Sequence, residues 1–108
     1  MSVDSVYKLF FDAMLALTGS STIETRLAYA LRSLHHLTVD GIPSEIASDV
    51  IDIEKIFYRD FEGTYEEYID TMSDYEAQKI AEKILEVFTK VVELDAVEQY
   101  QKDEDLNN

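Results

Sequence analysis

Apart from carboxylates, this chain of 108 residues has few of the side chains that most often perform chemistry. Cysteine is absent, so disulfides, thiolate catalysis and thiolate metal sites are impossible. His35 and His36 are the only histidines, and they are adjacent. Neighbouring residues of a helix point about 100° apart, so this pair cannot hold one metal ion as an i, i+4 pair can. We expect both imidazoles in a last helical turn, where positive charge complements the helix dipole.

The common catalytic motifs are also missing. The sequence has no glycine-rich phosphate loop, no G-x-S-x-G elbow, no H-E-x-x-H motif and no D-x-D-x-D-G calcium loop. It also lacks the Glu-x-x-His pairs that hold metals in carboxylate-bridged helical bundles. We therefore predict a protein that is not an enzyme and that has no cofactor or metal. A small metal protein or enzyme that uses carboxylates with His35 or His36 is the least favoured alternative.

Carboxylates are abundant, and they are unevenly distributed along the chain. The net charge is −14: residues 1–39 are neutral, residues 40–76 carry −10 and residues 77–108 carry −4. A surface of this sign repels phosphate backbones and anionic lipid heads. We therefore expect no direct binding to nucleic acid and no binding to membranes.

An acidic and aromatic block at residues 57–76 is the least ordinary part of the sequence. It holds six aromatic residues and seven acids, with Arg59 as its single base. One interpretation is an aromatic core beneath a solvated acidic surface. The other is an interaction surface, in which tyrosines anchor a contact and acids steer a basic partner. The residues that we predict for such protein binding are Tyr58, Asp60, Glu62, Tyr65, Glu66, Glu67, Tyr68, Asp70 and Asp74.

These features favour a non-enzymatic, acidic protein-interaction module that engages a basic protein surface as an adaptor, inhibitor, antitoxin or immunity-type partner. The alternative is a nucleic-acid mimic that inhibits a DNA- or RNA-binding protein. Mimicry requires carboxylates in rows at phosphate-like spacing on one exposed side of the molecule. The acids available for such rows are Asp49, Asp52, Asp60, Glu66, Glu67 and Asp70. A third hypothesis is a subunit of a larger helical assembly.

Helices must position these residues, because apolar residues recur at alternating spacings of four and three. The pattern predicts an all-α fold, a compact single-domain bundle of four to five antiparallel helices. The expected helices lie near 3–18, 22–37, 43–59, 64–72 and 74–98. The bundle domain then covers residues 1–98. Residues 99–108 have no apolar face, which predicts an acidic frayed or disordered tail.

Signals for helix ends agree with these faces. Pro43 suits the first turn of the third helix, and Asp40 with Gly41 before it is a turn signal. Three pairs have the spacing of a capping box, in which a hydroxyl and a carboxylate satisfy free N–H groups: Ser21 with Glu24, Thr64 with Glu67, and Ser73 with Glu76.

Two helices have apolar surfaces wider than one packing seam needs. The extra residues are Val6, Phe11 and Leu15 in the first helix, and Ala77, Ala81, Leu85, Phe88 and Val92 in the last. Such a helix is either central in its bundle or pairs with a second chain. A homo-oligomer formed through the first or last helix is therefore a further expectation.

The start of the chain and its apolar stretches bear on location. The N-terminal residues MSVDSV carry no positive charge ahead of an apolar run, which argues against a secretory signal. Apolar stretches such as residues 13–17 are far too short to span a bilayer. We therefore expect a cytoplasmic protein.

Overall fold

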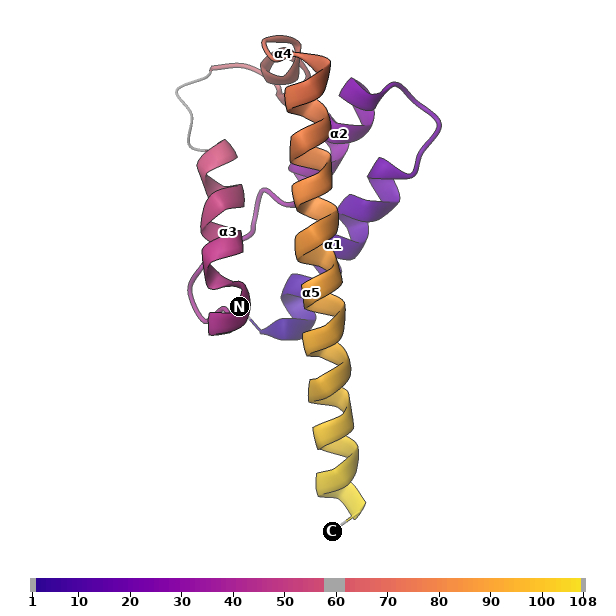
Figure 1. The fold of residues 1–108 in the computed structure, drawn as a ribbon, viewed down its shortest axis with the longest axis vertical. Coiled ribbons are helices and arrows are strands. Elements are labelled where there is room, and N and C mark those ends of the chain that lie inside the picture. The colour runs from indigo at the N-terminus through magenta and orange to yellow at the C-terminus, as the bar shows by residue number, and fades with distance from the viewer. Residues whose placement is uncertain (1, 58–61, 108) are drawn as a thin grey trace.

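The computed structural model describes residues 2–57 and 62–107. These residues form five helices and no strand, which confirms the predicted all-α bundle. The helices are α1 (Val3–Leu17), α2 (Ile23–Ser33), α3 (Ser44–Phe57), α4 (Tyr65–Asp70) and α5 (Asp74–Asn107). Figure 1 shows α5 as the long axis of the molecule, with α3 on one side, α1 and α2 on the other, and α4 at its N-terminal end.

Hydroxyl caps begin most of these helices. Thr64 Oγ1 accepts a hydrogen bond from Glu67 N at 3.1 Å, and Ser73 Oγ accepts from Glu76 N at 3.1 Å, which confirms two predicted caps. At the start of α2 the cap is Thr22, which accepts from Thr25 N at 3.3 Å. The prediction of Ser21 was therefore wrong by one residue. A run of hydroxyl residues precedes α2, and several of them can cap a helix equally well.

The second helix ends at Ser33, four residues before the expected end at residue 37. Two bonds of the tighter i→i−3 type follow, from His35 N to Arg32 O at 3.2 Å and from Leu37 N to Leu34 O at 2.9 Å. They turn the chain while Leu34 and Leu37 stay buried. The apolar periodicity continued through this turn, and so it overestimated the length of the helix.

The last helix differs in the opposite direction. It continues to Asn107, so the predicted end at residue 98 was wrong, and residues 99–107 have helical backbone. Pairs one turn apart support this extension: Lys102 Nζ lies 3.4 Å from Glu98 Oε1, and Tyr100 Oη donates to Glu104 Oε1 at 3.3 Å. The extension projects beyond the other helices (Figure 1).

Buried residues from all five helices form one core. α1 packs on α2 and α5, α4 packs on α2, and α3 packs on α5. The fully buried large side chains are Val6, Phe10, Leu27, Leu31, Leu34, Ile46, Val50, Ile53, Ile69, Ile84, Val87 and Val91. Within the described ranges, no helix combines the length and apolar character needed to cross a membrane.

Candidate protein-binding surface

Side chains of α2 hold the short helix α4 in place. A helix of six residues is not stable alone and needs such contacts. Arg32 Nη2 donates to both carboxylate oxygens of Glu66, at 2.9 and 3.2 Å. His35 Nδ1 and Tyr65 Oη share a hydrogen bond of 2.6 Å. Together with the burial of Ile69, these contacts fix the acidic block against the C-terminal end of α2.

The contacts to α2 change the pKa values of two residues in α4. A hydrogen bond from the backbone N–H of Glu66 itself lowers the pKa of its carboxyl, and the Arg32 guanidinium lowers it further. Burial raises the pKa of the Tyr65 phenol, with the charge of Arg32 acting against this rise. Glu66 is therefore ionised and paired, and Tyr65 is neutral, at physiological pH.

The predicted tyrosine anchors are mostly occupied inside the protein. Tyr68 is 8% exposed and belongs to the core, and Tyr65 is half-buried against His35. Tyr58 lies outside the described residues. Among the aromatic residues of this block whose side chains are described, Tyr75 is the exposed one, at 70%, although we did not predict it as a site residue. The helical periodicity of the last helix could have predicted this exposure, because Tyr75 points to the side of the helix opposite Ala77, Ile80 and Ile84.

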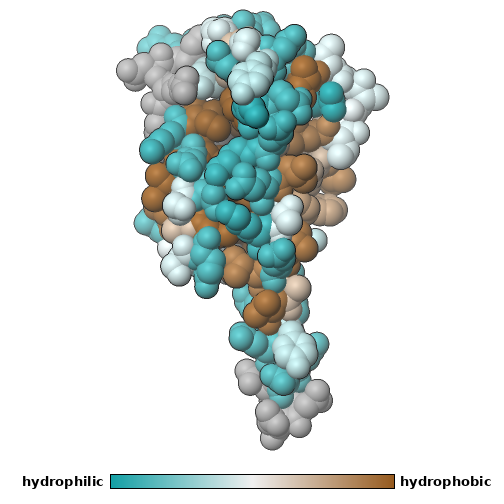
Figure 2. All heavy atoms as spheres, in the orientation of Figure 1, coloured by the Kyte–Doolittle hydropathy of each residue, from teal (hydrophilic) through white to brown (hydrophobic). Residues whose placement is uncertain are grey.

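Four of the predicted acids are exposed and free of ion pairs in the described part of the chain, as is Glu76, which we did not predict as a site residue. Among the described residues, no Lys or Arg lies within ion-pair distance of these carboxylates, which we call the acidic end: Glu62, Glu67, Asp70, Asp74 and Glu76. Glu66 is not among them because it is paired with Arg32, and Asp60 lies outside the described residues. Figure 2 shows hydrophilic side chains over α4 and the first turns of α5. The acidic end is therefore a concentrated negative surface.

A hollow of about 320 Å³ lies beside the acidic end. Its lining residues are Ile56, Tyr68, Met72, Tyr75, Glu76, Lys79 and Ile80. Lys79 Nζ lies 5.2 Å from the centre of the Tyr75 ring, in cation–π geometry. The hollow thus combines an apolar floor, an aromatic ring and a carboxylate, and it is large enough for one or two side chains of a partner.

Two acids of α3 interact with lysines of α5. Asp49 is 7% exposed, and its two oxygens accept from Lys83 Nζ at 2.7 Å and Lys90 Nζ at 2.8 Å. Asp52 lies 3.7 Å from Lys83. Hydrogen bonds from both lysines lower the pKa of Asp49, and the Asp49 carboxylate raises the pKa of each lysine. This cluster of Asp49, Lys83 and Lys90, which we call the α3–α5 clamp, joins two helices.

The two histidines lie in the turn after α2, beyond its last residue Ser33, and so the expectation that they occupy a last helical turn was wrong. Their ring centres are 5.6 Å apart in an edge-to-face arrangement. Within residues 2–57 and 62–107, no three His, Asp or Glu side chains converge in a way that could hold a metal ion. The hydrogen bond between His35 and Tyr65 gives His35 a structural role. The described geometry therefore offers no support for the alternative of a carboxylate and histidine metal site.

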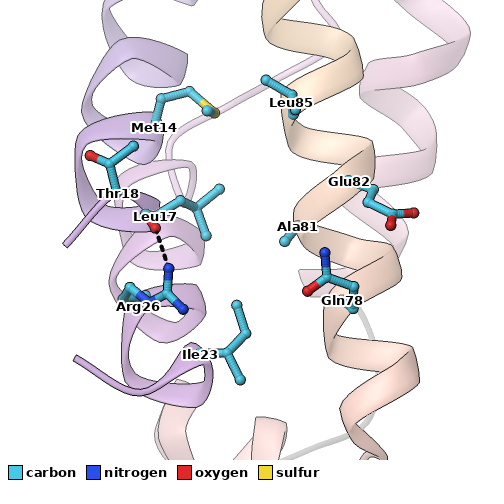
Figure 3. A pocket seen from close by; sticks show the side chains of 9 residues that line it. All are labelled: Met14, Leu17, Thr18, Ile23, Arg26, Gln78, Ala81, Glu82 and Leu85. Atoms are coloured by element: carbon cyan, nitrogen blue, oxygen red, sulfur yellow. Dashed lines mark hydrogen bonds between the residues drawn. The ribbon is translucent and has the colours of Figure 1, made fainter. Parts of the chain in front are cut away.

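A second hollow, of about 240 Å³, lies between α1, α2 and α5 (Figure 3). Met14 and Leu17 line it from α1, and Ala81 and Leu85 line it from α5. Arg26 Nη1 donates to Leu17 O at 2.8 Å and so satisfies a carbonyl at the end of α1. This arrangement ties α2 to α1, and it leaves a depression between α1 and α5 that is lined by apolar residues and also by Thr18, Arg26, Gln78 and Glu82.

In comparisons with known proteins, the chain matches no protein-family model, no curated protein and no solved structure.

Proposed function

We propose that this chain is a non-enzymatic interaction module whose acidic end binds a basic surface of another protein. In this proposal it acts in the cytoplasm as an adaptor, inhibitor, antitoxin or immunity-type partner. The observation that carries the proposal is the group of five exposed carboxylates around α4 and the start of α5, without ion pairs among the described residues. Charges of one sign on an exposed surface steer oppositely charged partners and raise the rate of association.

The hollow beside Tyr75 supports a partner rich in arginine or lysine. The aliphatic stem of such a side chain can pack on Met72 and Ile80, which line the hollow. Its cationic head then lies near Glu76 or over the Tyr75 ring, as Lys79 does in the free protein. An aromatic anchor beside unpaired acids is a common arrangement at protein interfaces.

The charge pattern gives less support to a nucleic-acid mimic. Asp49 is buried under two lysines, Asp52 lies near Lys83, and Glu66 is bound to Arg32. These three acids were needed for the phosphate-like rows. Of that predicted set, Glu67 and Asp70 are described as exposed without an ion pair. Two charges do not make a row, so we propose protein binding without mimicry.

The proposal is tested by affinity capture from the native cell with two tagged forms of the chain. One is the wild type, and the other is Glu67→Gln with Asp70→Asn and Asp74→Asn, which removes three charges of the acidic end. We expect quantitative mass spectrometry to identify a protein with a basic surface that the wild type retains at 50 mM salt. Binding should fall by at least about tenfold in the variant, or when salt is raised to 500 mM, because salt screens exposed charges beyond about 3–8 Å.

A matched control removes the same charge elsewhere. Glu93→Gln with Asp103→Asn and Glu104→Gln takes three charges from exposed positions of α5 outside the acidic end. This variant should retain the partner nearly as well as the wild type. If both variants lose the partner equally, net charge and not the acidic end controls binding. Equal capture of every partner by all forms, at both salt concentrations, would contradict the proposal.

A further inference from the structure

We infer that a second copy of this chain covers an apolar face formed by α1 and α5. This α1–α5 face consists of Tyr7, Phe11, Leu15, Leu85, Phe88 and Val92. It is separate from the acidic end, so the inference stands independently of the proposed function. Of the extra apolar residues predicted for the first and last helices, Val6 and Ala77 are buried in the core, whereas Phe11, Leu15, Leu85, Phe88 and Val92 lie on this face.

The α1–α5 face is continuous and open. Phe11, Leu15, Leu85 and Val92 are between 38% and 58% exposed. The Tyr7 ring joins the two helices, with its centre 6.1 Å from that of Phe11 and 6.0 Å from that of Phe88. Figure 2 shows hydrophobic side chains gathered along the side of α5 on which α1 lies. Contiguous exposed apolar surfaces of this kind are typical of interaction sites.

An uncharged stripe on α5 extends the face along the helix. At 100° per residue, eight uncharged residues lie on this side of α5: Gln78, Ala81, Leu85, Phe88, Thr89, Val92, Ala96 and Gln99. The spacing of four, three and four from Ala81 to Val92 is that of a coiled-coil seam. The hollow of Figure 3, between Met14, Leu17, Ala81 and Leu85, can accept an apolar side chain from the opposing surface.

The charge distribution favours a second copy as the occupant. Two chains of net charge −14 repel each other, and the repulsion is greatest where residues 40–76, with −10, would meet. The α1–α5 face joins helix α1, from the neutral segment 1–39, to the uncharged stripe of α5. Asp4 and Asp95 lie together at one end of this face, and over the rest of it two copies can approach with less repulsion than at the acidic end.

Lys8 supplies complementarity at the edge of this face. Lys8 is exposed and lies seven residues before Leu15, on the same side of α1. Among the lysines of the described residues, it is the one without an ion pair. The corresponding edge of α5 carries Glu82 and Glu86, which in the single chain lie 3.4 Å from Lys79 Nζ and 3.7 Å from Lys90 Nζ. A two-fold axis parallel to the helices places α1 of each copy against α5 of the other, so that Lys8 meets these acids.

The size of the face suits a dimer. Residues 78–99 of α5 extend about 33 Å and the 15 residues of α1 about 22 Å, and packed helices lie about 9 Å apart, so the two helices together present on the order of 500 Å² in projection. The accessible surface of the face is larger than this projected area, because side chains make it uneven. It therefore approaches the area of about 800 Å² that each partner buries in a stable interface. We therefore expect a moderately stable dimer, with Kd on the order of 1–10 µM.

Sedimentation of the full chain between about 1 and 500 µM tests the inference. The wild type should approach a mass of twice 12.4 kDa. The double variant Leu15→Gln with Leu85→Gln should weaken dimerisation at least about 30-fold, because the dimer buries four such side chains. Both positions are half exposed in one chain, so circular dichroism should show a folded helical protein.

Val97→Gln is the matched control for this variant. Val97 is 53% exposed on α5 but lies outside the uncharged stripe. Dimerisation of this control should therefore change less than about twofold.

A second variant keeps the apolar residues intact. Lys8→Glu should weaken the dimer about tenfold at 50 mM salt, and Lys55→Glu, with the same charge change on α3, should weaken it less than about threefold. For the wild type, added salt should strengthen dimerisation, whereas it should weaken binding of a basic partner. A wild type that stays monomeric at 500 µM and at both salt concentrations, or a Leu15→Gln, Leu85→Gln variant that dimerises like the wild type, would overturn the inference.

Discussion

Asp49 is a negative side chain inside a protein whose other acids lie mainly on the surface. Its burial is tolerated because each of its oxygens accepts a hydrogen bond from a lysine of α5. A buried carboxylate without such partners would lose several kcal/mol of solvation. The α3–α5 clamp therefore contributes specificity to the fold, since Asp49 fixes how α3 lies against α5.

Removing the charge of Asp49 should destabilise the protein. We expect Asp49→Asn to lower the free energy of unfolding by about 2–3 kcal/mol, because both lysines lose a charged acceptor. Asp52→Asn is the matched control, with a loss below about 1 kcal/mol, because Asp52 is mostly exposed. Urea unfolding at pH 7 measures both. Equal losses in the two variants would mean that the α3–α5 clamp adds nothing beyond surface charge.

The contribution of the Asp49 carboxyl to the free energy of unfolding should depend on pH. The folded protein lowers the pKa of Asp49 below its ordinary value of 3.8, so its stabilisation is complete above about pH 4 and is lost as pH falls below that value. The difference in stability between the wild type and Asp49→Asn should therefore shrink from pH 6 to pH 2.5. Urea unfolding across this range checks it, and a constant difference would show that the lowered pKa does not contribute.

The ionised carboxyl of Asp95 should destabilise the folded protein, whereas that of Asp49 stabilises it. Burial beside α1 raises its pKa, and the neighbouring Asp4 carboxyl raises it further. A raised carboxyl pKa means that the ionised form disfavours the folded state at neutral pH. Asp95→Asn should therefore raise Tm at pH 7 by on the order of one or two degrees, and the gain should disappear near pH 3. Thermal unfolding at both pH values measures this, with Asp103→Asn as the control at an exposed position.

Local signals of single residues were predictable, and long-range partners were not. The caps at Thr64 and Ser73 follow from a spacing of three residues, and the structure confirms them. Asp49, in contrast, meets lysines that are 34 and 41 residues away. The sequence alone does not say that α3 and α5 are neighbours, so this contact could not be predicted. The burial of Tyr68 agreed with the interpretation of the block as an aromatic core.

At the scale of elements, apolar periodicity located every helix but not every end. The core faces of α1, α3 and α5 follow from it, because burial is what selects those residues. The ends depend on other forces. α2 stops early where i→i−3 bonds turn the chain, and α5 continues where charged pairs one turn apart sustain a helix without a core.

The extension of α5 should therefore be the least protected helical segment. The side chains of residues 99–104 are all exposed, and a helix held by side-chain pairs alone frays readily. Hydrogen exchange at pH 7 should label amides of residues 99–107 within seconds. Amides of residues 80–94 should exchange at least about a hundredfold more slowly. Comparable protection of the two segments would show that the extension is packed in solution.

At the scale of the whole molecule, the excess of negative charge should make stability depend on salt. The net charge of −14 is only partly compensated by ion pairs such as those of the α3–α5 clamp. Self-repulsion disfavours the compact state, and salt screens it. Raising NaCl from 20 to 500 mM should therefore raise Tm by several degrees at pH 7. Thermal unfolding at a fixed concentration below that of dimerisation measures this, and an unchanged or lower Tm would mean that the acids are compensated locally.

Helix α3 packs mainly on α5, and this has a consequence for handling the protein in acid. Protonation of Asp49 removes the polar anchor that holds α3 against α5, and detachment of α3 would expose the apolar residues Ile46, Val50 and Ile53. The pKa of Asp49 lies below 3.8 in the folded protein, so this loss begins only below the isoelectric point of about 4.2. At the isoelectric point itself, the repulsion that keeps molecules apart vanishes while the α3–α5 clamp is still closed. We therefore expect folded protein to precipitate near pH 4.2, and α3 to lose its packing only in stronger acid.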